Sequence, residues 1–288
     1  MGVGLSLPDH QERVGLEELA VALATEAGRF VRDERPDVVS VAETKATVLD
    51  VVTVMDTRGE TMLRERIAAA RPDDGILGEE DGLSPGTSGL TWVLDPIDGT
   101  VNYLYDLPAY AVSVAVVVGD PTVPGGWSPV AGAVCNPRVD EVFHARAGGG
   151  ARLDRTSEPG GTAYPRGRAL TVREPESLAR TLLATGFSYD VDDRRTQGDI
   201  AVRMLTQVRD LRRMGAASLD LCHVAAGRVD AYYERGLQPW DMAAGMLVVT
   251  EAGGVVSGLD GPASRDMVVA AAPRLHATLH PVLVELHR

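Results

Sequence analysis

The chain has 288 residues, of which 44% are hydrophobic, and its formal net charge at pH 7 is −13. This length lies near the upper limit for a single hydrophobic core, so we expect one domain over residues 1–288. The acidic balance argues against nucleic-acid binding through a basic face, and no apolar run reaches membrane-spanning length.

Features of the termini and cysteines point to the cytoplasm. The N-terminus lacks the basic region and apolar core of a secretory signal. The two cysteines, Cys135 and Cys222, cannot form a disulfide framework and have no metal-ligand spacing. We therefore expect a cytoplasmic protein with two buried, reduced cysteines.

The N-terminal half begins with a helix. Apolar residues recur at helical spacing from about 15 to 33, and a polar connector follows over 34–50. A second helix starts at Asp56 or Thr57, with Glu60 placed to complete a capping box. The short apolar run at 51–55 is a strand or an extension of this helix. Further apolar runs, which we interpret as strands, cover residues 76–77, 92–95, 111–118, 130–134 and 141–145. The segment 154–168 is predicted to be a loop.

The C-terminal half alternates strands and helices again. We predict strands at 181–185, 208–213, 229–234 and 267–271, and helices at 194–205, 218–226, 241–252 and 273–287. Ser218 is the predicted cap of the second of these helices, and Gly227 ends it. This alternation predicts an α/β or α+β fold built in layers. We expect an N-terminal lobe over about 15–155 and a C-terminal lobe over about 170–288.

The stretch Trp92–Thr100 combines a strand with two carboxylates. The strand should end at Asp95, because Pro96 cannot donate a ladder hydrogen bond. Asp98 follows three residues later, and Gly99 permits a tight backbone beside it. Carboxylates at a strand end, followed by exposed backbone N–H groups, can bind a hard cation and a phosphate side by side.

Acidic residues beside strand ends or helix starts recur along the chain. The five positions are Asp56, Glu79, Asp95, Asp98 and Asp241. Gathered in one site, such carboxylates would repel one another and raise each other's pKa, and divalent cations would remove that repulsion. Oxygen ligands alone favour Mg²⁺ over zinc or iron. The six histidines lie outside every motif, and there is no nucleophile elbow or P-loop pattern.

One basic residue stands apart from the others. Of the 28 basic residues only Lys45 is a lysine, and the rest are arginines. Nucleotide bias in the gene accounts for the arginines but not for the single remaining lysine. A compact ammonium on a flexible stem differs physically from a planar guanidinium, so Lys45 is a candidate for a specific role in its loop.

Several motifs of the chain resemble those of the inositol monophosphatase family. Trp92 to Asn102 is similar to the first family signature, W-x-x-D-P-[IL]-D-G-T-x-N. Two later segments, Trp240–Gly245 and Thr250–Gly254, are together similar to the second family signature. Four further blocks match in order, at Asp50–Asp56, Gly78–Glu80, Gly215–Leu219 and Asp230–Glu234. The resemblance covers about residues 15–285.

This resemblance implies a fold, an activity and an assembly. The fold would be a layered αβαβα sandwich of the inositol monophosphatase and fructose-bisphosphatase type. The activity would be Mg²⁺-dependent hydrolysis of phosphate monoesters, sensitive to lithium, in a homodimer. We expect myo-inositol 1-phosphate as substrate. The alternatives are 3′-phosphoadenosine 5′-phosphate, fructose 1,6-bisphosphate or histidinol phosphate, or an additional regulatory binding role without catalysis.

The resemblance also implies residue roles. Two to three Mg²⁺ ions per subunit would be held by Glu79, Asp95, the Ile97 carbonyl, Asp98 and Asp241. Thr100 with Asp56 would orient and deprotonate the attacking water, and Glu79 would also take part in catalysis. The implied substrate contacts are Glu79, Ile97, Asp98, Gly99, Thr100, Gly215, Ala216, Ala217, Glu234 and Asp241. Among these, the N–H groups of Gly99 and Thr100 would hold phosphate, and Glu234 would accept from hydroxyls.

Overall fold

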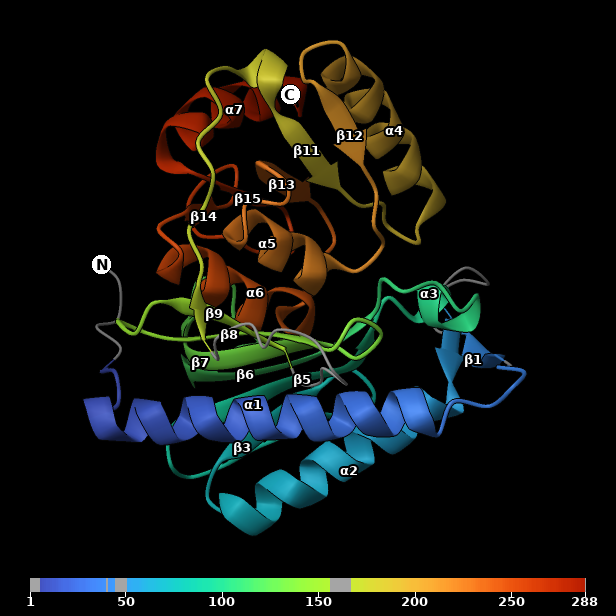
Figure 1. Ribbon diagram of the computed structural model, residues 1–288, viewed down its shortest axis with the longest axis vertical. Helices are drawn as coiled ribbons and strands as arrows, with labels where there is room; N and C mark the ends of the chain where they lie inside the picture. The colour runs from blue at the N-terminus through green and yellow to red at the C-terminus, as the bar shows by residue number, and fades with distance from the viewer. Residues whose placement is uncertain (1–5, 40, 45–50, 156–166, 288) are drawn as a thin grey trace.

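Two β-sheets alternate with three layers of helices in the structure of this chain (Figure 1). The computed structural model describes residues 6–39, 41–44, 51–155 and 167–287. From bottom to top in Figure 1, the order is helices, a large sheet, helices, a smaller sheet and helices. This arrangement confirms the predicted layered αβαβα fold.

The larger sheet has eight strands in the order β10-β9-β8-β7-β6-β5-β3-β4. Neighbouring strands are antiparallel except for β3 and β5, which are parallel. Its strands are β3 (Gly75–Gly78), β4 (Gly82–Ser84), β5 (Leu90–Asp98), β6 (Ala111–Gly119), β7 (Trp127–Asn136), β8 (Glu141–Arg146), β9 (Ala151–Arg155) and β10 (Arg168–Ala169). The central strand β6 is buried over nearly its whole length, since helices cover both faces of the sheet.

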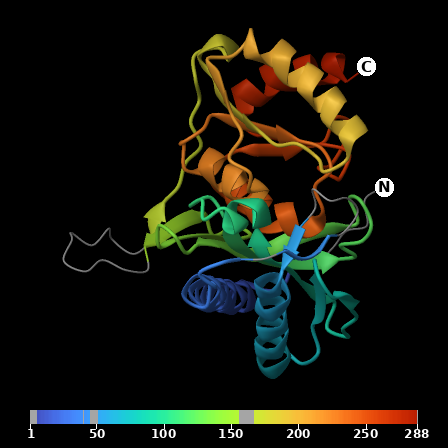
Figure 2. The ribbon, with the colours of Figure 1, turned by 90° about the vertical axis from the view of Figure 1, so that its right-hand side faces the viewer.

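Helices α1 (His10–Asp33) and α2 (Val54–Ala70) cover the outer face of this sheet. They cross one another beneath it, as Figure 2 shows. Leu16 of α1 and Leu63 of α2 pack with Trp92 and Val114 in one buried apolar cluster. A separate pair of short strands, β1 (Val41–Thr44) and β2 (Val51–Thr53), leads into α2.

The smaller sheet has five strands in the order β12-β11-β13-β15-β14. They are β11 (Leu182–Thr185), β12 (Asp210–Arg212), β13 (Ala231–Glu234), β14 (Val255–Ser257) and β15 (Val268–Ala271). Helices α4 (Val191–Leu205) and α7 (Pro273–Leu286) cover its outer face, and a short 3₁₀ helix, η1 (Leu178–Arg180), precedes β11. Ile200 and Leu279 pack there against Leu183 and Val269.

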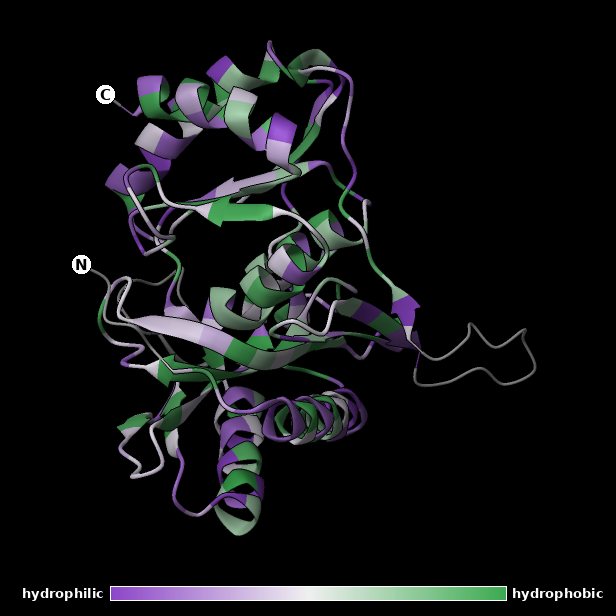
Figure 3. Cartoon of the chain, turned by 90° about the vertical axis from the view of Figure 1, so that its left-hand side faces the viewer, coloured by the Kyte–Doolittle hydropathy of each residue, from purple (hydrophilic) through white to green (hydrophobic). Residues whose placement is uncertain are grey.

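The middle layer consists of α5 (Ala217–Ala225) and α6 (Pro239–Glu251), which lie between the two sheets. Both helices are buried along most of their length, and in Figure 3 this layer is largely green. The outer helices carry purple stretches instead, since one side of each faces water. A one-turn helix, α3 (Thr100–Leu104), follows β5 at the edge of this layer. No helix in the described part of the chain is long and apolar enough to cross a membrane.

Three local predictions for the N-terminal half were wrong. Helix α1 begins at His10, because Asp9 caps it by accepting from the Glu12 N–H at 2.9 Å. Helix α2 begins at Val54, with Thr53 as its N-cap and Asp56, not Glu60, as the capping-box partner. Strand β5 does not end at Asp95 but runs through Pro96. The pairing register with β6 shifts there, so Pro96 lies in a bulge that needs no ladder donor.

Differences in the second half concern strand and helix boundaries. Strand β9 ends inside a segment predicted to be a loop. Helix α4 starts at Val191 because Asp190 accepts from two N–H groups of its first turn. The N-cap of α5 is Ala216, and Ser218 instead lies within the helix. Strand β14 was not predicted.

Candidate active site

Three carboxylates from distant parts of the sequence meet between the two sheets. Asp95 and Asp98 come from the end of β5, and Asp241 comes from the first turn of α6. One oxygen of each lies within 4.8 Å of the others. Asp95 and Asp98 are buried and Asp241 is half-buried. The structure therefore brings together three of the acidic residues singled out from the sequence.

A bulge in β5 places Asp95 and Asp98 on one side of the chain. Asp95 pairs with Ser113 and Asp98 pairs with Ala111, so three steps along β5 match two along β6. In a regular strand, residues three apart point to opposite faces. The extra residue cancels this alternation, and the Asp95 carboxylate accepts from the Ile97 N–H at 2.9 Å within the bulge.

The Asp98 carboxylate is fixed by the start of α5. It accepts from the backbone N–H groups of Ala217 and Ser218 at 3.2 and 2.7 Å, and from the Ser218 hydroxyl at 2.5 Å. Asp98 thus caps a helix that lies more than 100 residues away in the sequence. The unpaired N–H groups at a helix N-terminus favour such a negative charge.

The Asp241 carboxylate is held by its own helix. It accepts from the Gln238 N–H at 2.6 Å and completes a capping box at the start of α6. Ser113 of β6 donates to the Trp240 carbonyl at 3.1 Å, which ties this helix start to the large sheet. The three carboxylates are therefore oriented before any ligand binds.

Burial raises the pKa values of all three carboxylates, and repulsion adds to the shift of Asp95 and Asp241. Burial raises the pKa of Asp95 well above its usual value, and repulsion from Glu79, Asp98 and Asp241 adds to it. Burial likewise raises the pKa of Asp241, followed by repulsion from Glu79. Burial raises the pKa of Asp98 too, although hydrogen bonds from Ser218 and Ala217 oppose the shift. A bound divalent cation would relieve this repulsion, and the oxygen donors fit Mg²⁺.

Glu79 stands on a tight turn after β3, near enough to Asp95 and Asp241 to raise the pKa of both. Its N–H donates to the Leu94 carbonyl at 3.3 Å. The fully buried Glu60 supports the same turn, where it accepts from the Glu80 and Asp81 N–H groups at 2.8 and 3.0 Å. Glu60 was predicted to cap a helix, and its position under this turn was not recognised.

The same contact explains the glycine before Glu79. A Cβ at Gly78 would lie 2.1 Å from the Glu60 carboxylate oxygen. Any larger residue would displace either Glu60 or the turn. The glycine of the Gly78-Glu79-Glu80 motif is thus required by a helix residue 18 positions earlier.

Asp56 and Thr100 form a hydrogen-bonded pair at the margin of the cluster. The Thr100 hydroxyl lies 3.1 Å from the Asp56 carboxylate and 3.0 Å from the Ile97 carbonyl. Asp56 is buried and also accepts from the Thr53 N–H at 2.8 Å. Burial raises the pKa of Asp56 to about 6. A carboxylate with this pKa can accept a proton near neutral pH.

Gly99 brings the end of β5 against the start of α5. It adopts a left-handed backbone with φ of 92°. A Cβ there would lie 2.9 Å from the Ala109 carbonyl and 3.1 Å from the Gly215 carbonyl. Asn102 adds a second link by donating to the Met214 carbonyl at 2.8 Å. Gly215, Ala216 and Ala217 therefore lie beside the Gly99–Thr100 backbone.

Glu234, at the end of β13, lies near the same cluster. Its carboxylate accepts from the Tyr232 hydroxyl at 2.6 Å. Burial raises the pKa of Glu234 to about 7, and Asp98 and Arg213 both act on it electrostatically. A Cβ at Gly186 would lie 1.9 Å from the Glu234 carboxylate, so that glycine makes room for it. Lys45 and Asp50 lie outside the described residues.

The chain is similar to known proteins in both sequence and structure. A sequence model of the inositol monophosphatase family matches residues 13–288. An inositol-1-monophosphatase of Mycobacterium bovis is 44% identical over 287 residues, covering 93% of each chain. The Nus factor SuhB of Escherichia coli is 37% identical over 264 residues, covering 89% of this chain and 91% of that protein. The solved structure of Mycobacterium tuberculosis SuhB matches with a TM-score of 0.78 at 43% identity, covering 95% of this chain and 97% of that one.

Proposed function

The chain belongs to the inositol monophosphatase family and is a phosphatase, and from this premise we propose that it hydrolyses myo-inositol 1-phosphate to inositol and phosphate. The observation that supports a metal-dependent reaction is the convergence of Asp95, Asp98 and Asp241 within 4.8 Å. Related proteins named inositol-1-monophosphatase support the choice of substrate.

We assign the metal site to Mg²⁺, with two to three ions per subunit. The proposed ligands are Glu79, Asp95, the Ile97 carbonyl, Asp98 and Asp241. When bound, the ions supply positive charge that lowers the pKa of water and stabilises the departing alkoxide. The raised pKa values of Asp95 and Asp241 support this assignment, because burial and then mutual repulsion raise them and cations would neutralise the repulsion.

Asp56 and Thr100 are the proposed residues for water activation. The Thr100 hydroxyl would orient the attacking water, and Asp56 would accept its proton through that hydroxyl. The N–H groups of Gly99 and Thr100 would hold the phosphate oxygens. Glu79 would complete the catalytic set from the turn after β3.

The alcohol part of the substrate would lie against Gly215, Ala216, Ala217 and Glu234. Small side chains at the first three positions would limit steric conflict with that part of the substrate. The Glu234 carboxylate would accept hydrogen bonds from ring hydroxyls. It would repel a second phosphate, which disfavours fructose 1,6-bisphosphate and 3′-phosphoadenosine 5′-phosphate.

A substrate panel tests this proposal. Phosphate release should be measured with and without Mg²⁺ for myo-inositol 1-phosphate, the two bisphosphates and histidinol phosphate. We expect activity only with Mg²⁺ and the highest kcat/KM for the inositol ester. A tenfold or greater preference for the nucleotide would overturn the choice of substrate. Glu234→Gln keeps the shape of the side chain and removes its charge. This variant should show a smaller difference in kcat/KM between the inositol ester and the two bisphosphates.

A regulatory role is the second candidate function, because several relatives are named Nus factors. Such a role would act beside catalysis rather than replace it. Complementation with Asp95→Asn separates the two, since this change removes a proposed metal ligand and leaves the surface intact. Growth rescued by the inactive variant would support a second role, and growth that follows catalytic activity would exclude it.

Assembly and inhibition are also proposed from the family. We propose a cytoplasmic homodimer in which each chain forms a single two-lobed domain. Light scattering at micromolar concentration should give twice the 30.6 kDa mass of one chain. Lithium should inhibit by occupying a metal position vacated after product forms. Titration of LiCl into a steady-state assay tests this, and full activity at high millimolar LiCl would contradict it.

A further inference from the structure

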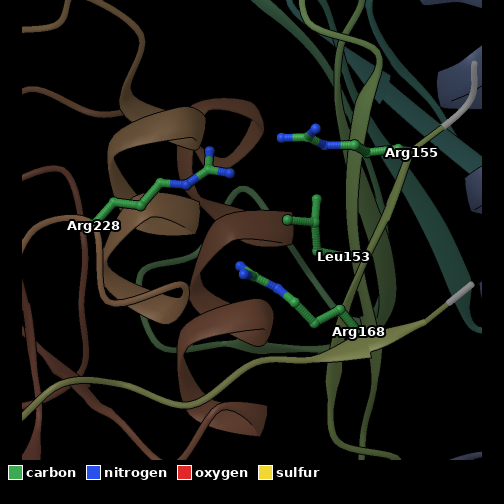
Figure 4. A pocket seen from close by; sticks show the side chains of 4 residues that line it. All are labelled: Leu153, Arg155, Arg168 and Arg228. Carbon is green, nitrogen blue, oxygen red and sulfur yellow. The ribbon is translucent and has the colours of Figure 1, made fainter. Parts of the chain in front are cut away.

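Three arginines converge on a cavity at the edge of the large sheet. Arg155 ends β9, Arg168 begins β10, and Arg228 follows the end of α5. Together with Leu153 they line a cavity of about 130 Å³. Figure 4 shows all three guanidinium groups pointing into the space beside Leu153. None of these residues has a part in the proposed reaction.

The strand register explains why these side chains share one face. Arg155 pairs with Glu141 of β8, and Leu153 pairs with Arg168 of β10. Residues directly opposite one another on neighbouring strands point to the same side of the sheet. Arg152 and Asp154 alternate with the lining residues and therefore face the other side.

A buried carboxylate holds two of the arginines in place. Glu141 accepts from both terminal nitrogens of Arg228 at 2.6 and 2.7 Å, and from Arg155 at 3.1 Å. The Arg228 guanidinium also stacks over the Phe143 ring, 5.4 Å from its centre. A guanidinium has five N–H donors, so Arg228 keeps donors beyond those that Glu141 uses. The orientation of both arginines is fixed without a ligand, which lowers the entropy lost when one binds.

Arg168 differs from the other two arginines in its charge partners. Within the described part of the chain, no carboxylate lies in ion-pair range of Arg168. Three guanidinium groups thus meet at one cavity in a chain whose net charge is −13. Planar guanidinium groups recognise oxyanions such as phosphate through paired N–H donors.

We propose that this cavity is a binding site for a small oxyanion of the phosphate class, held by Arg155, Arg168 and Arg228. The volume exceeds the ~30 Å³ that one water molecule occupies in the liquid and suits one phosphate group rather than a nucleotide. The shared chemistry is a tetrahedral oxyanion, supplied either as free inorganic phosphate or as the phosphoryl group of an organic ester.

The cavity is separate from the carboxylate site. Asp98 binds the first N–H groups of α5, whereas Arg228 follows its last turn. The nine residues of α5 span about 13 Å. The oxyanion site is therefore independent of the proposed reaction. Evidence against that reaction would not argue against the oxyanion site.

Calorimetric titration of inorganic phosphate into the full-length protein tests the site. EDTA should be present, since without metal the carboxylate cluster repels anions. Arg168→Gln is the informative variant, because Arg168 is exposed and supports no buried carboxylate. Arg152→Gln is its control, from the neighbouring strand but facing the other side. We expect phosphate to bind about tenfold or more weakly to Arg168→Gln and unchanged to Arg152→Gln.

Competition experiments identify the ligand chemistry. Sulfate should displace phosphate, whereas chloride at equal ionic strength should not. Glycerol 2-phosphate tests whether the site binds the phosphoryl group of an organic ester. Binding of this ester, of free phosphate or of both supports the site. Equal affinity of Arg168→Gln and the unchanged protein, equal displacement by chloride, or binding of neither phosphate compound would overturn the proposal. Both variants should keep the kcat of the unchanged enzyme.

Discussion

Asp95 is a carboxylate that folding buries close to other negative charges. It is 1% exposed and surrounded by other carboxylates, which raise its pKa together with burial. In Asp95→Asn the amide keeps the shape and can still accept from the Ile97 N–H. The negative charge that repels its neighbours is lost.

We therefore expect opposite effects of Asp95→Asn on stability and activity. Without metal, the variant should be more stable by about 1 kcal/mol, because one repulsive charge is gone. Its kcat should fall on the order of a hundredfold or more, since a proposed metal ligand is lost. Thermal unfolding in EDTA and phosphate release with saturating Mg²⁺ measure the two effects. A less stable, fully active variant would contradict both the repulsion and the ligand role.

The pH dependence of the reaction should report Asp56. Its pKa is raised by burial to about 6, so the residue is ionised above this pH and protonated below it. A proton acceptor must be ionised, and kcat/KM should therefore fall as pH drops through about 6. In Asp56→Asn that acid limb should disappear, with kcat lowered about a hundredfold or more. Thr100→Ser keeps the hydroxyl and should retain the acid limb. An unchanged profile in Asp56→Asn would exclude Asp56 as the acceptor.

At the scale of elements, the turn after β3 depends on a helix residue beneath it. Glu60 of α2 accepts from two N–H groups of this turn and pairs with Arg64 at 2.8 Å. The turn carries Glu79, a proposed metal ligand. Glu60 thus acts as a positioning residue and does not itself reach the metal site.

Truncation of Glu60 should loosen metal binding rather than unfold the protein. We expect Glu60→Ala to raise the Mg²⁺ concentration for half-maximal activity by about tenfold, as loss of outer support for a ligand typically does. Glu60→Gln keeps one acceptor oxygen for the turn and replaces the other with an NH2 donor, so its effect should be intermediate. Glu65→Ala, on the exposed side of the same helix, is the matched control. If Mg²⁺ dependence in Glu60→Ala equals that of the control, the turn does not need Glu60.

At the scale of the whole molecule, the carboxylate site joins the large sheet to the middle helix layer. Strand β5 of the large sheet supplies Asp95 and Asp98, and α5 and α6 of the middle layer supply the N–H groups and Asp241. Metal bound there would hold these elements together. Metal should therefore stabilise the fold as a whole and not only the site.

The stabilisation by Mg²⁺ should grow with pH. The pKa values of Asp95 and Asp241 are raised in the folded, metal-free protein, so these groups take up protons at a higher pH than ordinary carboxylates do. Protonation relieves the repulsion and competes with Mg²⁺. We expect a gain in Tm of about 5 °C at pH 7.5 and a clearly smaller gain at pH 5.5, by calorimetry with Mg²⁺ or EDTA. NaCl of equal ionic strength is the control, and equal gains at both pH values would contradict the argument.

Much of the element order could be predicted from the sequence. Helical spacing of apolar residues located α1 and α2, and a continuous apolar run located the buried strand β6. Such patterns are local, since each depends on one face of one element meeting the core. Boundaries were less accurate. The caps Asp9, Thr53 and Asp190 lie one residue before helices that were predicted to start later.

What the sequence determined by itself is the set of chemical groups: acidic residues beside strand ends, and motifs that resemble one phosphatase family. Only the tertiary structure decided how these groups meet. The bulge at Pro96 turns Asp95 and Asp98 to one side, α5 binds Asp98 across more than 100 residues, and Glu60 supports the turn of Glu79. The three arginines likewise share a cavity only through strand register and the end of α5. These contacts join segments far apart in the chain, and local spacing carries no information about which distant segments will pack together.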